Sequence, residues 1–182
     1  MPAILTGPGF FGGGEARGLF STVDAAPALL DAAAISVPES MAGHSILPVI
    51  RDRKASRRDE AFIQIRETQT GRALRTQRWK YSVTAEYDAA RDRADTYRED
   101  FLYDLDNDPY ELVNLAGMSA FRKVSDNMKQ QLLAWIKSVE GATPQITAKT
   151  GVDPFQRLPA KGHGLSPERL MIDPYKSPLA RD

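Results

Sequence analysis

A stripe of apolar side chains towards the C-terminus sets the strongest constraint on how this chain folds. Large apolar residues recur at spacings of three and four over residues 119–140, which predicts one long helix with a single apolar face: Phe121, Val124, Met128, Leu132, Trp135, Ile136 and Val139. Gly141 suits the position just beyond the helix, and Pro144 follows where a helix cannot continue. An apolar face this long has to be covered, and strands predicted upstream provide the surface.

Strand and turn signals fill the region before this helix. Residues 62–66 are rich in β-formers, residues 68–71 are a turn signal, and residues 73–84 alternate between apolar and polar side chains. Residues 101–105 predict another short strand, which the turn sequence Asp-Asn-Asp-Pro ends. The charged residues 86–100 predict a loop or an irregular insertion. We therefore expect a small antiparallel sheet packed on one long C-terminal helix, an α+β fold.

The N-terminal region has a different pattern. An apolar run over residues 2–5, ended by Gly and Pro, is typical of a buried strand that leaves a sheet. Residues 21–35 predict a helix, with Asp24 capping its first turn and Pro27 inside that turn. One strand and one helix cannot make a core, so this piece is expected to belong to a larger α/β domain.

Two further segments lack periodicity. Residues 51–58 contain no apolar residue larger than alanine and predict an exposed linker, although their basic side chains could instead hold phosphate or sulfate. Residues 142–182 are rich in Pro and Gly and predict an extended tail that wraps over a larger body. Its apolar anchors would be Phe155, Leu158, Leu170, Met171, Ile172 and Tyr175.

Composition excludes several classes of function. The 182 residues carry 24 basic and 24 acidic side chains, so no basic excess attracts nucleic acid or an anionic membrane. The apolar runs are too short to span a bilayer, and the N-terminus lacks the pattern of a signal peptide, which predicts a cytoplasmic location by default. The chain has no Cys, which excludes disulfides, thiolate zinc sites and a Cys nucleophile.

The remaining candidates for chemistry are few. His44 and His163 have no nearby carboxylate at helical spacing and are interpreted as loop residues. Residues 104–108 resemble the start of a calcium loop, but Pro109 and Leu115 occupy the positions where such a loop needs Gly and Glu. A turn held by its own carboxylates is the better interpretation. We therefore predict no metal site and no cofactor in this chain.

One cluster could bind an anion. Arg75, Arg78 and Lys80 lie beside Trp79 and Tyr81, so cations and aromatic rings could form a substrate-binding surface. The alternative is an ordinary amphipathic hairpin with its charges in water.

Several motifs in order resemble the sulfatases, sulfuric ester hydrolases of the alkaline-phosphatase superfamily. They are PAILTGPG at residues 2–9, STVDAAPALLD at 21–31, VPESMAGHSILP at 37–48, ALRTQRWKY at 73–81 and FLYDLDNDPYELVNLA at 101–116. The resemblance covers residue 2 to about residue 140. It implies a C-terminal portion: the end of the large α/β domain (1–50), a linker (51–58), the antiparallel subdomain (59–141) and the tail (142–182).

The resemblance carries over no catalytic or metal residue. The family's nucleophile is a formylglycine made from Cys or Ser in Cys/Ser-x-Pro-x-Arg, and the nearest candidate, residues 36–40, lacks the Arg. Calcium is expected only in the full-length enzyme. The expected partner is a missing N-terminal sulfatase catalytic domain or a sulfatase subunit, and the expected ligand of the whole enzyme is a sulfated small molecule or glycan.

The resemblance leaves more than one role open for the chain itself. It would close the cleft and stabilise the large domain, with Arg75, Arg78, Lys80 or Tyr81 binding substrate near the leaving group. The alternative is a non-catalytic binding or assembly module that pairs with a separate catalytic chain. An intact enzyme with unfamiliar chemistry is the third possibility.

Overall fold

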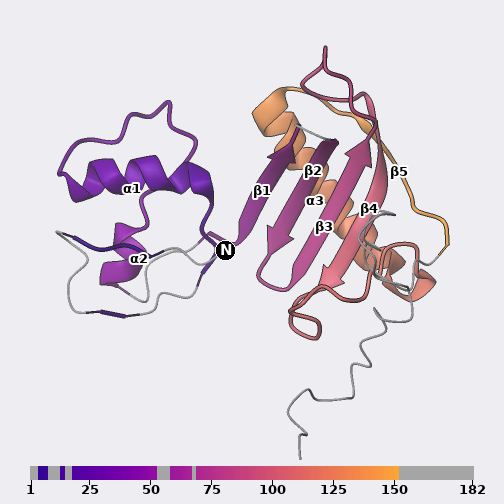
Figure 1. Cartoon of the computed structure of the whole chain (residues 1–182), viewed down its shortest axis with the longest axis horizontal. Coiled ribbons are helices and arrows are strands. Elements are labelled where there is room, and N and C mark those ends of the chain that lie inside the picture. Colours follow the sequence, from indigo (N-terminus) through magenta and orange to yellow (C-terminus); the bar gives the residue numbers. More distant parts are fainter. Residues whose placement is uncertain (1–3, 8–12, 15–17, 53–57, 67–68, 152–182) are drawn as a thin grey trace, which may run out of the picture.

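The computed structural model describes residues 4–7, 13–14, 18–52, 58–66 and 69–151. Its main body is one sheet with a long helix across one face, as Figure 1 shows. The strands run in the order β1-β2-β3-β4-β5, with β5 pairing parallel to β4 and the other pairs antiparallel. Their bounds are β1 Glu60–Ile65, β2 Thr70–Thr76, β3 Trp79–Ala85, β4 Thr96–Asp104 and β5 Gln145–Thr147. This architecture confirms the predicted α+β class.

The long helix α3, Arg122–Glu140, confirms the prediction from the apolar stripe. A 3-10 turn, Ser119–Phe121, leads into it, and Gly141 follows with a positive φ of 65°, the left-handed conformation that ends many helices. The stripe is buried at Met128, Leu132 and Ile136, whereas Val139 near its end is half exposed.

The core lies between α3 and the sheet. Strand alternation turns every second residue towards the helix, and these side chains close over the apolar stripe. The buried cluster consists of Leu74, Tyr81, Val83, Tyr97, Leu102, Ala116, Met128, Leu132 and Ile136. Burial of this apolar surface is the main force that holds helix and sheet together.

Two sequence predictions are corrected in this region. The loop predicted over residues 86–100 is wrong at its end, because Thr96–Asp104 forms the single strand β4, with Tyr97 buried against the helix. The charged residues of this strand hid its alternation, since Glu99 faces the core beside an arginine. The tail begins with β5, which was not predicted; residues 152–182, including the predicted anchors, lie outside the described residues.

The N-terminal region carries two helices, α1 Ala25–Ala32 and α2 Leu47–Arg51. Helix α1 confirms the predicted helix, and Pro27 lies in its first turn as expected. The predicted strand at residues 2–5 falls partly outside the described residues, and Ile4 and Leu5 form no strand. Of the predicted linker, residues 53–57 are not described, and Arg58 forms an isolated antiparallel bridge with Leu19. Within the described ranges, no helix has the length and apolar character needed to cross a membrane.

Candidate functional site

The hairpin of β2 and β3 carries the four residues predicted to bind substrate. Arg75 and Lys80 are register partners on adjacent strands and share the face of the sheet away from α3. Tyr81, one residue on, therefore points the opposite way, into the core beneath α3. Arg78 lies in the turn between the strands. The structure thus brings Arg75 and Lys80 together and separates Tyr81 from them.

Arg78 is bound to a carboxylate rather than free in water. Its Nε and Nη2 donate to Oδ1 and Oδ2 of Asp104 at 2.9 and 2.7 Å, and its guanidinium lies 4.8 Å from the centre of the Trp79 ring. The hydrogen bond from Arg78 lowers the pKa of Asp104 to about 2, and the Asn107 amide, which donates to the same carboxylate, adds to this effect. The paired charges fix the position of the guanidinium over the ring.

The same contacts bear on the calcium-like sequence at residues 104–108. Asp104 already accepts from Arg78 and Asn107, while Oδ2 of Asp108 accepts from the Val113 amide at 2.8 Å. These contacts are those of a turn closed by its own carboxylates. No group of three or more His, Cys, Asp or Glu among the described residues could hold a metal ion. The described carboxylates of this turn are already bonded within the chain and do not form a calcium site.

Lys80 is also paired. Its Nζ lies 2.5 Å from Oε2 of Glu111 and 5.9 Å from the centre of the Tyr103 ring. Glu111 has a φ of 57°, a left-handed conformation that is costly for a residue with a side chain. The ion pair therefore holds the loop after β4 in a strained conformation next to the hairpin.

Arg75 differs from these two cations. Among the residues that the structure describes, its side chain has no ion pair or hydrogen bond, and it is partly buried between Ala61 and Lys80 on the neighbouring strands. Of the three predicted cations, it is the one whose charge no described carboxylate neutralises.

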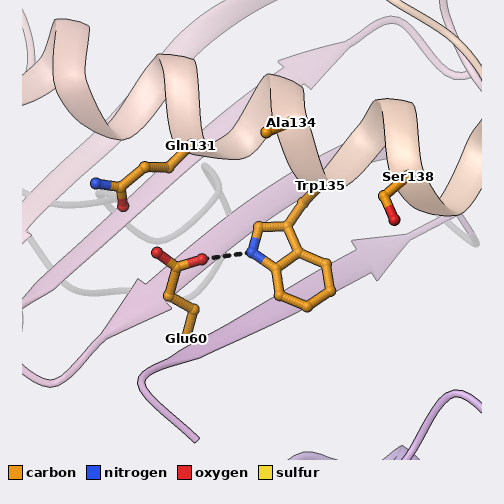
Figure 2. A pocket seen from close by; sticks show the side chains of 5 residues that line it. All are labelled: Glu60, Gln131, Ala134, Trp135 and Ser138. Carbon is orange, nitrogen blue, oxygen red and sulfur yellow. Dashed lines mark hydrogen bonds between the residues drawn. The ribbon is translucent and has the colours of Figure 1, made fainter.

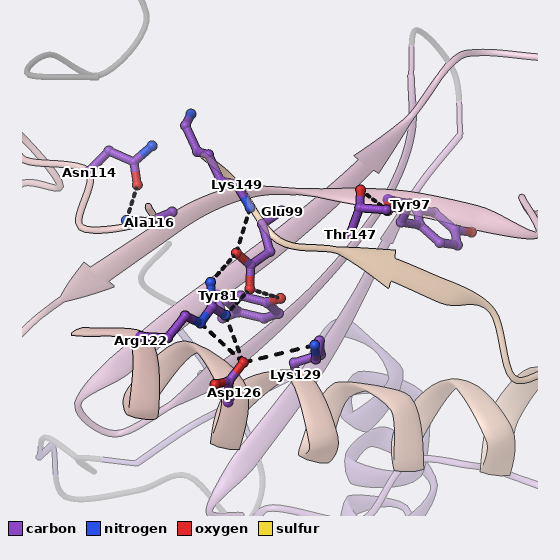
Figure 3. Close-up of polar contacts among 10 residues, drawn as sticks. All are labelled: Tyr81, Tyr97, Glu99, Asn114, Ala116, Arg122, Asp126, Lys129, Thr147 and Lys149. Atoms are coloured by element: carbon purple, nitrogen blue, oxygen red, sulfur yellow. Dashed lines mark hydrogen bonds and ion pairs between the residues drawn. The ribbon is translucent and has the colours of Figure 1, made fainter. Parts of the chain in front are cut away.

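Tyr81 belongs to a buried polar network under the sheet (Figure 3). Its hydroxyl donates to Oε1 of Glu99 at 3.0 Å, and burial followed by the charge of Glu99 raises the pKa of Tyr81. Two nitrogens of Arg122 lie 2.8 and 2.5 Å from the Glu99 oxygens, and the Lys149 amide donates to Oε2 at 2.9 Å. The network joins β3, β4, α3 and the residues after β5.

Asp24 lies at the centre of a second polar network, which the sequence analysis did not predict. The sequence analysis expected Asp24 to cap helix α1. Its Oδ2 instead accepts from the Ser21 amide at 2.9 Å and its Oδ1 from the His44 amide at 3.0 Å. Arg58 pairs with the same carboxylate, with Nη2 2.5 Å from Oδ1. The expected cap is therefore wrong, because the carboxylate joins three separate segments. The spacing of Ser21 and Asp24 was the available signal, since it is that of a capping box.

The loop that contains His44 packs tightly on this carboxylate. A Cβ added at Gly43 would lie 1.9 Å from the Val23 carbonyl oxygen, so the sequence needs glycine there. His44 Nδ1 lies 3.0 Å from the Gly43 carbonyl oxygen, while Ser45 hydrogen bonds to Asp31. His163 lies outside the described residues.

The comparison with protein families shows which family this chain belongs to. Residues 1–138 match the family described as N-sulphoglucosamine sulphohydrolase, C-terminal. The chain belongs to this family. The motifs that resembled sulfatases at residues 2–9 through 101–116 all lie inside the match.

Curated relatives agree with this sulfatase assignment. Arylsulfatase K of Rattus norvegicus is 29% identical over 144 residues, and the match covers 72% of this chain and 23% of the rat protein. Arylsulfatase K of Homo sapiens is 28% identical over 142 residues, covering 72% of this chain and 25% of the human protein. The chain thus spans about a quarter of the length of these relatives.

Solved structures support the same fold. BT4656, solved in complex with its substrate D-glucosamine-2-N,6-O-disulfate, has a TM-score of 0.53 at 25% identity, covering 66% of this chain and 24% of that one. A sulfatase-family protein of Bacteroides thetaiotaomicron has a TM-score of 0.52 at 26% identity, covering 72% and 27%. Both are similar to this sulfatase C-terminal chain over a minor part of their own length.

Proposed function

We propose that this chain forms the C-terminal part of an enzyme that hydrolyses sulfate esters, and that the nucleophile and the calcium ligands come from another part of that enzyme. The family match over residues 1–138, together with relatives in which the matched part is only about a quarter of the whole length, is the observation that carries the proposal. The absence of Cys from the sequence supports it, since a Cys-derived nucleophile would have to come from elsewhere.

The exposed apolar residues of the N-terminal region support the same division of the chain. Ile4, Val23, Leu29 and Ile35 are each more than half exposed, at 92, 51, 64 and 55%. Exposed apolar side chains that are frequent in one segment of the sequence favour packing of that segment against another part of a protein. We infer that residues 1–50 complete the large α/β domain and that residues 59–141 form the adjoining subdomain, with 51–58 as linker and 142–182 as a wrapping tail.

The charges on the hairpin support a structural and cleft-closing role. Arg78 pairs with Asp104 at the end of β4, and Lys80 pairs with Glu111 in the loop that follows. Both cations are therefore already paired with carboxylates inside the subdomain. Arg75 has no such carboxylate partner among the described residues, and a guanidinium suits a sulfate group because it donates two parallel hydrogen bonds. We therefore assign Arg75 as the residue of this chain best suited to contact sulfated substrate.

An activity assay with separated and combined parts tests the proposal. The chain alone, supplied with calcium and an aryl sulfate, should give no turnover above the buffer rate. Coexpression with a catalytic sulfatase polypeptide of the same source, carrying Cys/Ser-x-Pro-x-Arg, should give a copurifying complex that releases sulfate. Turnover by the chain alone would refute the proposal.

Two further outcomes separate the roles. In the active complex, Arg75→Ala should raise KM by about tenfold, because one charged contact is worth about 1.4 kcal/mol or more. A complex that forms without any change in sulfate release relative to the catalytic polypeptide alone would favour the assembly module and contradict the cleft-closing role.

A further inference from the structure

We propose that a groove between α3 and β1 binds a sugar ring that carries free hydroxyl groups and no sulfate. The groove has a volume of about 340 Å³ and is lined by Glu60, Gln131, Ala134, Trp135 and Ser138. It lies on the α3 side of the sheet, whereas Arg75 and Lys80 face the other side. The inference does not rest on the proposed sulfatase role.

An aromatic ring of fixed orientation forms the apolar part of this groove. The indole N–H of Trp135 donates to Oε2 of Glu60 at 2.5 Å, as Figure 2 shows, and the ring stacks on Phe62 with a centre distance of 6.2 Å and an angle of 7°. Ala134 beside it is small and leaves room next to the ring. The C–H face of a sugar ring can pack on such a surface, because an indole offers a broad apolar plane with a polar edge.

Polar atoms around the ring have unused hydrogen-bonding capacity. Of the two carboxylate oxygens of Glu60, Oε2 accepts a hydrogen bond and Oε1 has no partner among the described residues. Oε1 can therefore accept a hydrogen bond from a ligand. Oε1 of Gln131 has no partner in the described structure and lies just below the surface, so a ligand reaches it once this side chain turns into the groove; its Nε2 donates to Asn127 at 3.3 Å. A buried acceptor without a donor is costly, so a ligand that donates to it gains affinity.

The charge of the lining selects the ligand. Two acceptors, one of them a carboxylate oxygen of Glu60, require donor groups, and vicinal hydroxyls supply them. None of the described residues that line the groove is a Lys or an Arg. A sulfate group offers only acceptors and a negative charge, so it would be repelled by Glu60 and leave Gln131 unpaired. The groove therefore fits an unsulfated ring.

The tryptophan fluorescence of the full chain can be used to measure sugar binding in the groove. It contains two tryptophans, and Trp79 lies on β3, so Trp79→Phe leaves Trp135 as the sole indole. Titration of this variant with tri-N-acetylchitotriose should change the Trp135 emission saturably, with a Kd of about 1 mM. An N-sulfated glucosamine oligosaccharide of equal length should bind at least about tenfold more weakly.

Matched variants connect the binding to the groove. Gln131→Ala and Glu60→Gln should each weaken binding by about tenfold, whereas Gln130→Ala, an exposed neighbour on the same helix, should leave it unchanged. Thermal unfolding of each variant shows that it is folded. Three results would overturn the inference: no saturable change at about 20 mM sugar, equal binding of the sulfated oligosaccharide, or equal effects of Gln131→Ala and Gln130→Ala.

Discussion

Arg72 in β2 and Glu140 in the last turn of α3 form a buried ion pair that joins the end of the helix to the sheet. The Nε–Oε1 distance is 2.5 Å, and the two side chains are only 3 and 9% exposed. The guanidinium also donates to the carbonyl oxygens of Gly71 at 2.8 Å and Asp92 at 2.9 Å. One side chain therefore fixes the helix, the strand and the loop before β4.

Removing one member of this pair should destabilise the fold strongly. Arg72→Met leaves the Glu140 carboxylate buried without a positive charge beside it, with the Gln64 amide as its remaining donor, and we expect the free energy of unfolding to fall by about 3 kcal/mol. The double variant Arg72→Met, Glu140→Leu removes both charges and should recover most of that loss. Urea unfolding of the single and double variants measures both effects, and additive losses would contradict the pairing.

Glu99 should make the stability of the fold depend on acid. Burial alone would raise its pKa, but the hydrogen bonds from Arg122, the Lys149 amide and Tyr81 outweigh burial and hold the pKa below its ordinary value. A lowered carboxylate pKa stabilises the folded state above the unfolded-state pKa of about 4.3, and this contribution is lost as the pH falls through the folded-state value.

The variant Glu99→Gln tests this dependence. It keeps the shape of the side chain but has no titrating proton, so its urea midpoint should change less than that of the native chain as the pH falls below about 5. Asp126→Asn is the control, because Asp126 pairs with the same Arg122 from an exposed position. Identical acid profiles for the native chain and Glu99→Gln would contradict the prediction.

The elements that the sequence could predict are those built from apolar periodicity. Leu132 on the helix and Leu74 and Val83 on the strands repeat at helical and strand spacings, and all three are buried in one core. This periodicity can be identified without knowing which distant residues pack together, because it depends only on which side chains are buried away from water.

The buried ion pairs could not be predicted in the same way. Arg72 and Glu140 are 68 residues apart, and Glu99 is 23 residues from Arg122, so nothing local identifies the partners. A charged residue in a sequence predicts exposure, and only a specific partner reverses that expectation. The hairpin cations show the same limit: alternation places Arg75 beside Lys80, but the pairing of Lys80 depends on the loop conformation at Glu111.

A methyl group at Gly43 should disrupt the contact between its loop and the 3-10 turn Thr22–Asp24 that precedes α1. The added Cβ would lie 1.9 Å from the Val23 carbonyl oxygen, so Gly43→Ala has to move the His44 amide away from Asp24. Amide hydrogen exchange should become faster at His44 while the sheet is unaffected. Ala42→Ser is the neighbouring control, and unchanged exchange at His44 in Gly43→Ala would refute the close contact.

Arg78 should control the titration of Asp104. Because its hydrogen bond lowers the pKa of Asp104 to about 2, Arg78→Gln should raise that pKa towards the ordinary value of about 3.9. The native stabilisation is present above pH 4 and lost as the pH falls towards 2, and Arg78→Gln should lose this contribution. Carboxyl carbon shifts in NMR spectra measure the pKa directly, with the exposed Arg98→Gln as control. An unchanged Asp104 titration in Arg78→Gln would contradict the pairing.

The strain at Glu111 should appear only when its ion pair is removed. Its φ of 57° costs a non-glycine residue about 1–2 kcal/mol, and the pair with Lys80 offsets this cost. In a Lys80→Met background the pair is absent, so Glu111→Gly should stabilise the chain by about 1 kcal/mol. In the native background the same change also breaks the pair, so the gain in stability should be smaller or reversed.

Urea unfolding of the four chains measures the coupling energy between Lys80 and Glu111. The variant Glu111→Asn is the control: Asn tolerates this backbone conformation and has no charge, so it separates the relief of backbone strain from the loss of charge. If Glu111→Gly had equal effects in both backgrounds, Lys80 would not be what holds the loop in place.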